Sequence, residues 1–275
     1  MNKIGERSGE KLDLNIEQDP FGEDAPLVCL EELKSWIVYE DSHLLVINKP
    51  GWLVCHPSKN GPLSSLVGAC REYTGLESLH LVSRLDRETS GVVLLAKDKK
   101  MARICQMSME FRLVKKIYNV LLIGELNKEI YVDQPLAKDI KSSVHAKQCV
   151  RQDRTSQEAQ TTFRPLYSQN GYTFCEVELH TGRKHQIRAH AEWLGFPIVG
   201  DKIYGGNEEL FLEFIEKGWT EKMSNQLIMK RQAIHAARLE FLHPEFKESF
   251  SAPLPEDMDQ FCNGFMKLKI SSVSI

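Results

Sequence analysis

The chain has 275 residues, of which 42% are hydrophobic and 27% charged, proportions that are ordinary for a globular protein. No apolar run approaches the roughly 18 to 20 residues that a membrane-spanning helix needs, and the start of the chain lacks the apolar core of a secretory signal. We therefore expect a cytoplasmic protein that does not contact a membrane. The seven cysteines form neither a C-x-x-C pair nor a zinc spacing, so we expect free thiols.

Charge is distributed unevenly along the chain, although the formal net charge is only −3. Residues 1–41 hold 11 acidic side chains against 4 basic ones, whereas residues 97–154 hold 13 basic against 7 acidic. A solvated surface of mixed charge is the commoner origin of such an imbalance. The basic excess also permits a surface that follows a phosphate backbone, so the net charge does not exclude nucleic acid as a partner.

The order of the predicted elements indicates an acidic arm followed by one folded domain. Residues 1–31 contain turn-forming residues and no sustained apolar period, so we predict a mobile or loosely docked arm there and a domain over 32–275. Apolar patterning then predicts, in the first half of the chain, a hairpin over 36–54, a helix near 63–70, strands at 80–82 and 92–96, a helix over 98–113 and a strand over 115–126. A polar excursion with one short strand is expected over 126–156, followed by a hairpin over 159–179 that turns at Asn170-Gly171. The predicted elements of the remaining chain are a helix of about three turns over 185–195, a helix near 208–217, strands at 233–244 and 246–252, and a helix near 255–266.

Strands that arrive as hairpins with helices between them are typical of the α+β class. We therefore predict a mixed, largely antiparallel central sheet flanked by helices. The regular alternation of strand and helix that marks a doubly wound nucleotide-binding fold is not present in the sequence.

The stretch SRLDRETSG, residues 83–91, places three charges between two apolar segments. Desolvating an unpaired charge costs several kcal/mol, so these side chains either reach solvent or have fixed partners. If the stretch is extended, Arg84 and Asp86 project to one side while Leu85 anchors the other. Taken alone, the pattern is also typical of an exposed, salt-bridged turn, in which Arg87 pairs with Glu88.

A second charged cluster is HTGRKHQIRAH, residues 180–190, in which histidines recur every five residues. Five residues advance a helix by about 500°, so successive histidines lie some 140° apart and cannot share one face. We therefore expect no metal site. His185 and Arg188 are three residues apart and are neighbours on the helix.

The segment before this helix carries the residues of a possible anion site. Thr181 and Gly182 are expected to serve as its cap and turn, with Arg183 and Lys184 beside the helix start. A helix N-terminus with basic side chains beside it binds an anion or phosphate readily. An ordinary capped helix on the surface explains the same residues equally well. No phosphate-binding glycine loop, dinucleotide-binding glycine motif, G-x-S-x-G or H-E-x-x-H motif occurs, so we expect neither a nucleotide nor a metal cofactor.

The combination of these blocks resembles the RluA-type pseudouridine synthases. SRLDRETSGVVLLAKD, KKIYNVLLIGEL and LHTGRKHQIRAHAEWLGFPIVGDKIYGG occur in that family's order, as do INKPGWLVCHP and RQAIHAARLEFLHP, so the likeness runs from about residue 36 to 253. Two departures exist: the family usually has histidine where this chain has Ser83, and some relatives carry an N-terminal S4 RNA-binding domain. The acidic arm is too short for one, so we expect the catalytic domain, residues 32–275, to find its RNA alone.

The resemblance implies an enzyme that isomerises specific uridines in structured RNA, ribosomal or transfer RNA, and works as a monomer without a cofactor. It implies that Asp86 is the catalytic aspartate, that Tyr118 stacks on the target base, and that Arg188 pairs with the aspartate. Arg84 would fill the space left by the flipped nucleotide, and we add Arg183 and His185 as candidate substrate-binding residues.

The chemistry fits one ionised carboxylate. Breaking and remaking a glycosidic bond without water needs no second carboxylate, in contrast to hydrolytic glycosidases, and Arg188 would keep the pKa of Asp86 low. The target base must first leave its stack, at a cost of a few kcal/mol. Whether Asp86 attacks the sugar or removes its 2′ proton stays open. Two alternatives remain: a noncatalytic RNA-binding or RNA-folding factor on the same fold, and a nucleosidase that uses Asp86 with Glu88.

Overall fold

The main feature of the computed structural model, which describes residues 26–56 and 61–269, is a twisted sheet of ten strands in the order β1-β2-β4-β11-β5-β10-β9-β6, with β3 added to β4 and β12 to β11. The strands of this sheet are β1 (Ile37–Glu40), β2 (Leu44–Lys49), β3 (His80–Leu81), β4 (Ser90–Ala96), β5 (Val114–Ile123), β6 (Ile130–Asp133), β9 (Gln160–Gln169), β10 (Tyr172–Leu179), β11 (Ile234–Phe241) and β12 (Ser249–Ser251). A separate two-stranded sheet pairs β7 (Leu136–Lys138) with β8 (Gln148–Val150).

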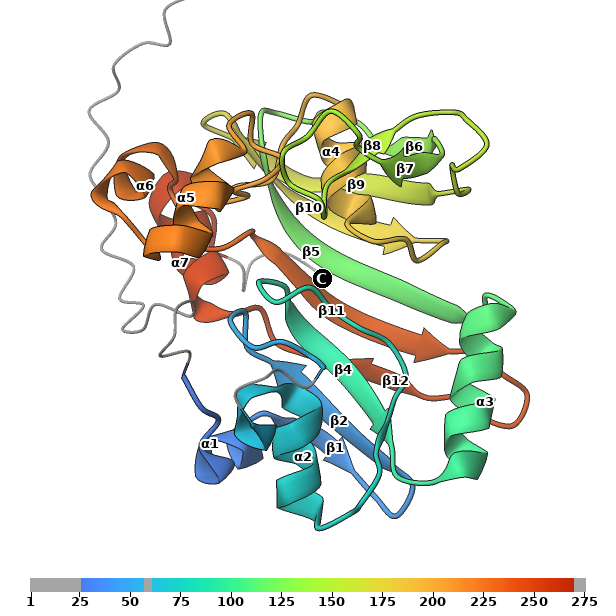
Figure 1. Ribbon diagram of the computed structural model, residues 1–275. Coiled ribbons are helices and arrows are strands. Elements are labelled where there is room, and N and C mark those ends of the chain that lie inside the picture. The colour runs from blue at the N-terminus through green and yellow to red at the C-terminus, as the bar shows by residue number, and fades with distance from the viewer. Residues whose placement is uncertain (1–25, 57–60, 270–275) are drawn as a thin grey trace, which may run out of the picture.

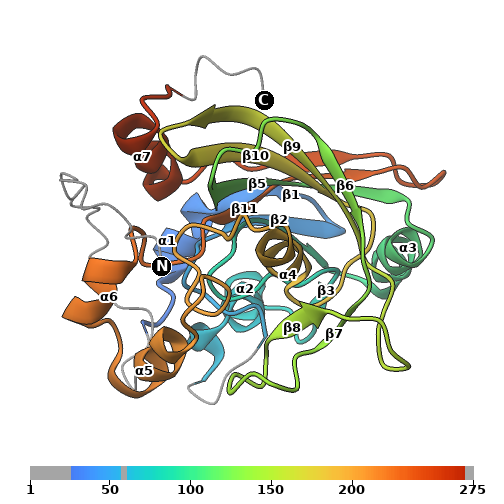
Figure 2. The same cartoon turned by 90° about the horizontal axis from the view of Figure 1, so that it is seen from above.

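Helices cover both faces of the main sheet. They are α1 (Leu30–Ser35), the 3-10 helix η1 (Pro62–Ser64), α2 (Leu66–Thr74), α3 (Lys99–Glu110), α4 (Gln186–Trp193), α5 (Glu209–Lys217), α6 (Glu221–Gln226) and α7 (Glu256–Phe265). Seen from above, α2 and α4 lie on one side of the sheet and α7 on the other (Figure 2).

The strand β11 joins the two halves of the sheet. It runs between β4 and β5, parallel to the first and antiparallel to the second (Figure 1). Apart from this parallel pairing, the neighbouring strands of the sheet are antiparallel. The predicted α+β class, with a mixed and largely antiparallel sheet, is therefore confirmed.

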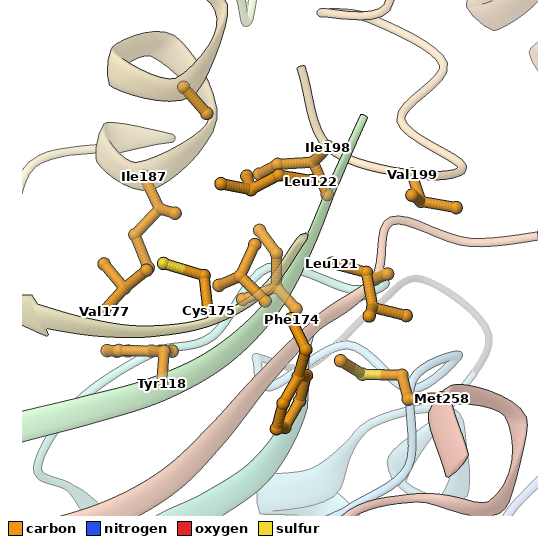
Figure 3. Packing of buried hydrophobic residues seen from close by; sticks show 14 of the residues in the cluster. Tyr118, Leu121, Leu122, Phe174, Cys175, Val177, Ile187, Ile198, Val199 and Met258 are labelled. Atoms are coloured by element: carbon orange, nitrogen blue, oxygen red, sulfur yellow. The ribbon is translucent and has the colours of Figure 1, made fainter. Parts of the chain in front are cut away.

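Alternating side chains of β10 supply the core on both faces of the sheet. Cys175 packs on the side of Ile187 from α4, whereas Phe174 points to the opposite side, toward Met258 of α7 (Figure 3). All four side chains are at least nine-tenths buried. Because strand side chains alternate with a period of two, one strand fixes helices on both faces.

Leu85, in the charged loop, packs against two core clusters at once. One contains β5, β10 and α4, and the other contains β2, β4 and α2. This leucine therefore anchors the loop where the two halves of the molecule meet, which is the role that the sequence predicts for it.

Both predicted hairpins are confirmed. In the second, Asn170 and Gly171 have φ values of 57° and 81°, so the two-residue turn uses the left-handed conformation that Asn-Gly favours. Local patterns were less informative elsewhere: residues 126–156 contain three short strands instead of one, and α6 was not predicted. Helix α4 spans 8 residues, about two turns instead of three, and Gly195 follows it with φ 81°.

The structured part of the chain begins before residue 32. Val28 is buried and its backbone N–H donates to the carbonyl oxygen of Leu63 at 2.8 Å, and Leu30 begins α1. Residues 1–25 of the predicted arm lie outside the described residues. Among the described helices, none has the length and apolar character to cross a membrane, and all seven cysteines are unpaired.

Candidate active site

A cleft of about 890 Å³ opens beside the charged loop between β3 and β4. Its walls come from residues 82–87 of that loop, from β5, and from the turn at residues 179–185 that leads into α4. The predicted site residues that line it are Arg84, Asp86, Tyr118, Arg183 and His185. The sixth, Arg188, is bonded to Asp86, so the fold brings together residues that are up to about 100 positions apart in the sequence.

The carboxylate of Asp86 faces three nitrogen-bearing side chains. Arg188 Nη1 donates to Asp86 Oδ2 at 3.2 Å, and Gln232 Nε2 donates to the same oxygen at 3.5 Å. His185 Nε2 lies 3.7 Å from it. The contact between Arg188 and Asp86 that the resemblance implies is therefore present.

These neighbours hold Asp86 in its ionised form. Burial raises the pKa of the Asp86 carboxyl, but electrostatic interactions with His185 and Arg188, together with hydrogen bonds from Gln232 and Arg188, outweigh burial. The pKa therefore falls below its ordinary value of 3.8. Burial also lowers the pKa of His185 to about 4, so its imidazole is neutral at pH 7 and Arg188 supplies the lasting positive charge.

Arg188 is itself fixed by a second carboxylate. Its Nε and Nη2 donate to Asp201 Oδ2 and Oδ1 at 2.6 and 2.8 Å, and both side chains are buried. The backbone N–H groups of Ile203 and Tyr204 donate to Asp201 Oδ1 as well. The Tyr204 ring lies 4.8 Å from the guanidinium carbon of Arg188. Only the Nη1 edge of the guanidinium is thereby left to reach Asp86.

His185 is oriented by the hydroxyl group of Tyr204, which lies 3.0 Å from its Nδ1. The backbone N–H of Gln148 donates to that hydroxyl oxygen at 2.7 Å, so the hydroxyl proton is free to be donated to Nδ1. The neutral imidazole then carries its proton on Nε2, the nitrogen that faces Asp86.

The turn before α4 is built differently from the predicted cap. The residue at the N-cap is His185, with φ 54° and no capping hydrogen bond from its side chain. Gln186 Oε1 instead accepts hydrogen bonds from Thr181 Oγ1 and from the backbone N–H of Arg183, each at 2.9 Å. The predicted cap at Thr181 and Gly182 is therefore wrong, because a side chain inside the helix binds the turn that precedes it.

Tyr118 lies in the middle of β5, between β11 and β10. Its backbone pairs with Ala236 on one side and Val177 on the other, and its side chain is 9% exposed where it meets the cleft. Burial raises the pKa of the phenol, so it stays protonated at neutral pH. A flat aromatic surface is thus held rigidly in the cleft that contains Asp86.

The backbone on either side of Asp86 is held from the first hairpin. The buried ammonium group of Lys49 donates to the carbonyl oxygen of Arg87 at 2.9 Å and to that of Leu53 at 2.8 Å. The sulfur of Cys55 accepts a hydrogen bond from the backbone N–H of Leu85 at 3.4 Å. The loop is therefore not a free surface turn, and its position is determined by β2 and the residues that follow it.

Glu88 points away from the cleft. Its carboxylate forms an ion pair with Lys202 at 2.6 Å and accepts a hydrogen bond from the backbone N–H of Gln232 at 3.2 Å. Glu88 is not among the residues that line the cleft with Asp86.

Sequence reasoning missed four residues that position the site: Lys49, Asp201, Tyr204 and Gln232. The segment GDKIYGG, residues 200–206, is rich in turn-forming residues and has no apolar period, although its aspartate and tyrosine are 2% and 1% exposed. The one signal in the sequence was that Asp201 directly follows the apolar run Ile198-Val199-Gly200. An acidic residue at the end of an apolar run suggests a buried ion pair.

The three histidines of residues 180–190 serve separate structural contacts. His180 Nε2 lies 2.8 Å from Thr162 Oγ1, and His190 Nδ1 lies 2.8 Å from Thr161 Oγ1. His185 faces the cleft. Within residues 26–56 and 61–269 no three metal-binding side chains converge.

Comparison with known proteins decides the family. The family model described as RNA pseudouridylate synthase matches residues 43–193. The chain belongs to the RNA pseudouridylate synthase family. Members of this family isomerise uridine in RNA to pseudouridine, so the protein is an enzyme of that class.

Relatives at the level of the whole chain agree with this assignment. The chain is 34% identical over 259 residues to an uncharacterized RNA pseudouridine synthase, YjbO, of Bacillus subtilis, covering 92% of this chain and 84% of that protein. It is also 34% identical over 261 residues to ribosomal large subunit pseudouridine synthase D of Xanthomonas campestris pv. campestris, covering 92% of this chain and 75% of that protein. Among solved structures, human RNA pseudouridylate synthase domain containing 4 superimposes with a TM-score of 0.69 at 26% identity, covering 90% of this chain and 96% of that one.

Proposed function

We propose that this pseudouridine synthase isomerises specific uridines in structured RNA, with Asp86 as its single catalytic carboxylate. The observation that carries the proposal is the position of Asp86: it lines the cleft and it is bonded to an arginine that a second carboxylate holds in place. A carboxylate that is charged before substrate arrives can act at the sugar without first losing a proton.

The reaction that the site would perform is an isomerisation. The bond between ribose C1′ and uracil N1 breaks, the base turns, a new bond forms between C1′ and C5, and the proton on C5 is lost as N1 gains one. The atoms and electrons balance without an oxidant, a reductant or a source of energy. Attack of Asp86 on C1′ and removal of the 2′ proton by Asp86 both begin at the same carboxylate, so either route uses this geometry.

The target base has to reach the cleft before this chemistry begins. We propose that the uridine is turned out of its stack and that its base lies on Tyr118, while Arg84, which is exposed at the cleft, enters the space left in the RNA. Strand pairing on both sides fixes the backbone of Tyr118, and the packing of its nearly buried side chain holds the ring in the cleft that would receive the base.

For the RNA itself we propose the large-subunit ribosomal RNA. The support is a relative named ribosomal large subunit pseudouridine synthase D, which is 34% identical over most of both chains. Local loop shape and splayed bases are the features that such enzymes can read in RNA, and we expect the protein to act on a stem-loop as a monomer in the cytoplasm.

The geometry disfavours the two alternatives from the sequence. A nucleosidase with two carboxylates needs both of them at the sugar, but Glu88 is bound to Lys202 outside the cleft. A noncatalytic RNA-binding factor would have no need for an ionised Asp86 with a dedicated arginine.

The decisive experiment maps pseudouridine in total RNA from cells that lack the gene and from cells that carry it. We expect specific sites in large-subunit ribosomal RNA to be lost and to be restored by the wild-type gene but not by Asp86→Asn. The matched control is Glu110→Gln, which neutralises an exposed carboxylate at the same cleft and should restore modification. An active Asp86→Asn protein, with RNA binding within a few fold of wild type, would refute the catalytic assignment.

A further inference from the structure

One end of the cleft collects positive charge from three parts of the chain. Arg112 follows α3, Lys116 lies on β5, and Arg183 precedes α4, and all three line the cleft. The charges of Arg183 and Arg112 add to burial in lowering the pKa of Lys116, so the three cations are close enough to repel one another.

The alternation of β5 separates two neighbouring lysines onto opposite faces. Lys116 lines the cleft with Tyr118, two residues further on, whereas Lys115 is paired with Glu240 at 3.7 Å and is not part of the cleft. At about 3.3 Å per residue, Lys116 and Tyr118 are about 7 Å apart along the strand. Lys116 and Tyr118 are therefore adjacent positions on the face of β5 that lines the cleft.

Lys116 lacks a counter-ion. Across residues 26–56 and 61–269 its ammonium group has no carboxylate or carbonyl partner, although the side chain is half-buried. Gly182 lies beside it: a Cβ atom at that position would be 3.4 Å from Lys116 Nζ, so the missing side chain leaves the ammonium group accessible. Half-buried charges are normally paired, and this one lies open toward the cleft.

Glu158 binds two of these cations, one through its carboxylate and the other through its backbone carbonyl. Glu158 Oε2 accepts from Arg112 Nη2 at 3.1 Å, and the Glu158 backbone carbonyl accepts from Arg183 Nε at 2.9 Å. The Arg112–Glu158 pair is half-exposed on both sides, so an incoming anion can exchange with the carboxylate at little cost. Glu110 also lines this part of the cleft but is exposed.

We infer that Lys116, Arg183 and Arg112 form a binding site for one backbone phosphate of the RNA, with Lys116 as its anchor; this deepens the proposed function and rests on it. A backbone phosphodiester offers two non-bridging oxygens, and each can accept more than one hydrogen bond, which suits one ammonium group and two guanidinium groups. Bound there, the phosphate would neutralise the repulsion among the cations and fix the register of the RNA, so that the neighbouring nucleotide meets Tyr118.

The test measures how the affinity for RNA depends on salt. The probe is a fluorescein-labelled RNA hairpin with a uridine-containing loop, titrated with the full chain by fluorescence anisotropy at several salt concentrations. The compared proteins are wild type, Lys116→Gln, the charge-conserving Lys116→Arg, and Lys115→Gln, which removes the same charge from the opposite face of β5.

We expect Lys116→Gln to reduce the slope of log affinity against log salt by about 0.7 to 0.9, the value for one lost phosphate contact, with an affinity about 3- to 10-fold lower at low salt. Lys116→Arg should keep the wild-type slope, and so should Lys115→Gln. An unchanged slope in Lys116→Gln, or an equal fall in Lys115→Gln, would overturn the site.

A second variant tests the site independently, in case Lys116→Gln does not fold. Glu158→Gln removes the carboxylate that competes with the phosphate for Arg112 and should raise the affinity at low salt by about threefold. No gain in affinity would also count against the site. Because slopes report phosphate contacts and not turnover, an active Asp86→Asn protein would refute the catalytic proposal while leaving this measurement intact.

Discussion

Arg188 and Asp201 form a buried bidentate ion pair, with Nε–Oδ2 and Nη2–Oδ1 distances of 2.6 and 2.8 Å. The Arg188 side chain is 7% exposed and that of Asp201 is fully buried. Two of the three guanidinium nitrogens, Nε and Nη2, thereby bind Asp201. The planarity of the group then determines how the third nitrogen, Nη1, is oriented toward Asp86. The geometry at Asp86 thus depends on a carboxylate that does not touch it.

Asp201→Asn should destabilise the fold and impair the site together. Neutralising Asp201 leaves the buried Arg188 with Asp86, at 3.2 Å, as its remaining carboxylate partner, and breaking a buried ion pair costs about 3 kcal/mol. We expect the midpoint of thermal unfolding to fall by roughly 6 to 12 °C, measured by differential scanning calorimetry. Glu31→Gln, in the exposed pair with Lys34, is the control and should leave the midpoint unchanged.

The pH dependence of turnover should have no acid limb above about pH 5. The pKa of Asp86 is lowered below 3.8 and that of His185 is about 4, so both groups keep their neutral-pH forms as the pH falls to that point. The stability that comes from the lowered pKa of Asp86 is present above the unfolded carboxyl value and is lost as the pH falls through the folded one. The measurement is the single-turnover rate at saturating RNA.

Gln232→Leu provides the comparison for that profile. It removes the hydrogen bond from Nε2 to Asp86 Oδ2, so the pKa of the carboxyl should rise and the acid limb should move to higher pH. A wild-type rate that already declines between pH 7 and pH 5, or a variant profile identical to the wild type, would contradict the proposed ionisation of Asp86.

Glu88→Gln should retain pseudouridine formation and release no free uracil. The Glu88 carboxylate binds Lys202 and the backbone of Gln232 outside the cleft, so its charge supports the loop and not the reaction. We expect a lower unfolding temperature with product formation intact, measured by chromatography of the digested RNA. Loss of activity in a folded Glu88→Gln protein would instead favour chemistry with two carboxylates.

Gly91→Ala should destabilise the chain far more than Gly75→Ala, although both glycines have positive φ. At Gly91, with φ 110°, a Cβ atom would lie 2.2 Å from the carbonyl oxygen of Ala236 on β11, whereas nothing lies within 4 Å at Gly75. Gly75→Ala should lower the free energy of unfolding by only about 1 kcal/mol, the cost of a left-handed backbone at alanine, which corresponds to about 2 to 4 °C in the midpoint of thermal unfolding. Equal shifts for the two in thermal unfolding would show that β4 can move away from β11.

Local sequence patterns predicted most elements of the fold and the main loop of the site, but neither α6 nor all three strands within residues 126–156. Alternation located both hairpins, and Asn170-Gly171 identified its turn because few residue pairs accept two left-handed conformations. Three charges between apolar segments singled out the Asp86 loop, since such an interruption needs either solvent or fixed partners. The resemblance then named Tyr118 and Arg188, which periodicity alone did not.

The supporting residues could not be found in the same way. Asp201 and Tyr204 lie in a turn-rich segment with no periodicity, and Gln232 precedes a strand as an ordinary polar residue. Their importance comes from contacts with residues 13 to 146 positions away, at Arg188 and Asp86. The prediction of a helix cap at Thr181 was wrong for a related reason: the Gln186 side chain, from inside the helix, accepts the hydrogen bond from the backbone N–H of Arg183 in this turn.

The position of β11 between β4 and β5 has a consequence for how the protein is made. Both of these strands leave the ribosome well before residues 234–241. Until then the edge of β5 and the Ser90–Gly91 end of β4 lack the partner that β11 provides, whereas β3 already pairs the far end of β4. Such edges are templates for pairing with other chains. A nascent chain therefore passes through a long interval in which it is exposed to aggregation, and the hydrogen bond from Gln232 to Asp86 forms only after this late part of the chain has emerged.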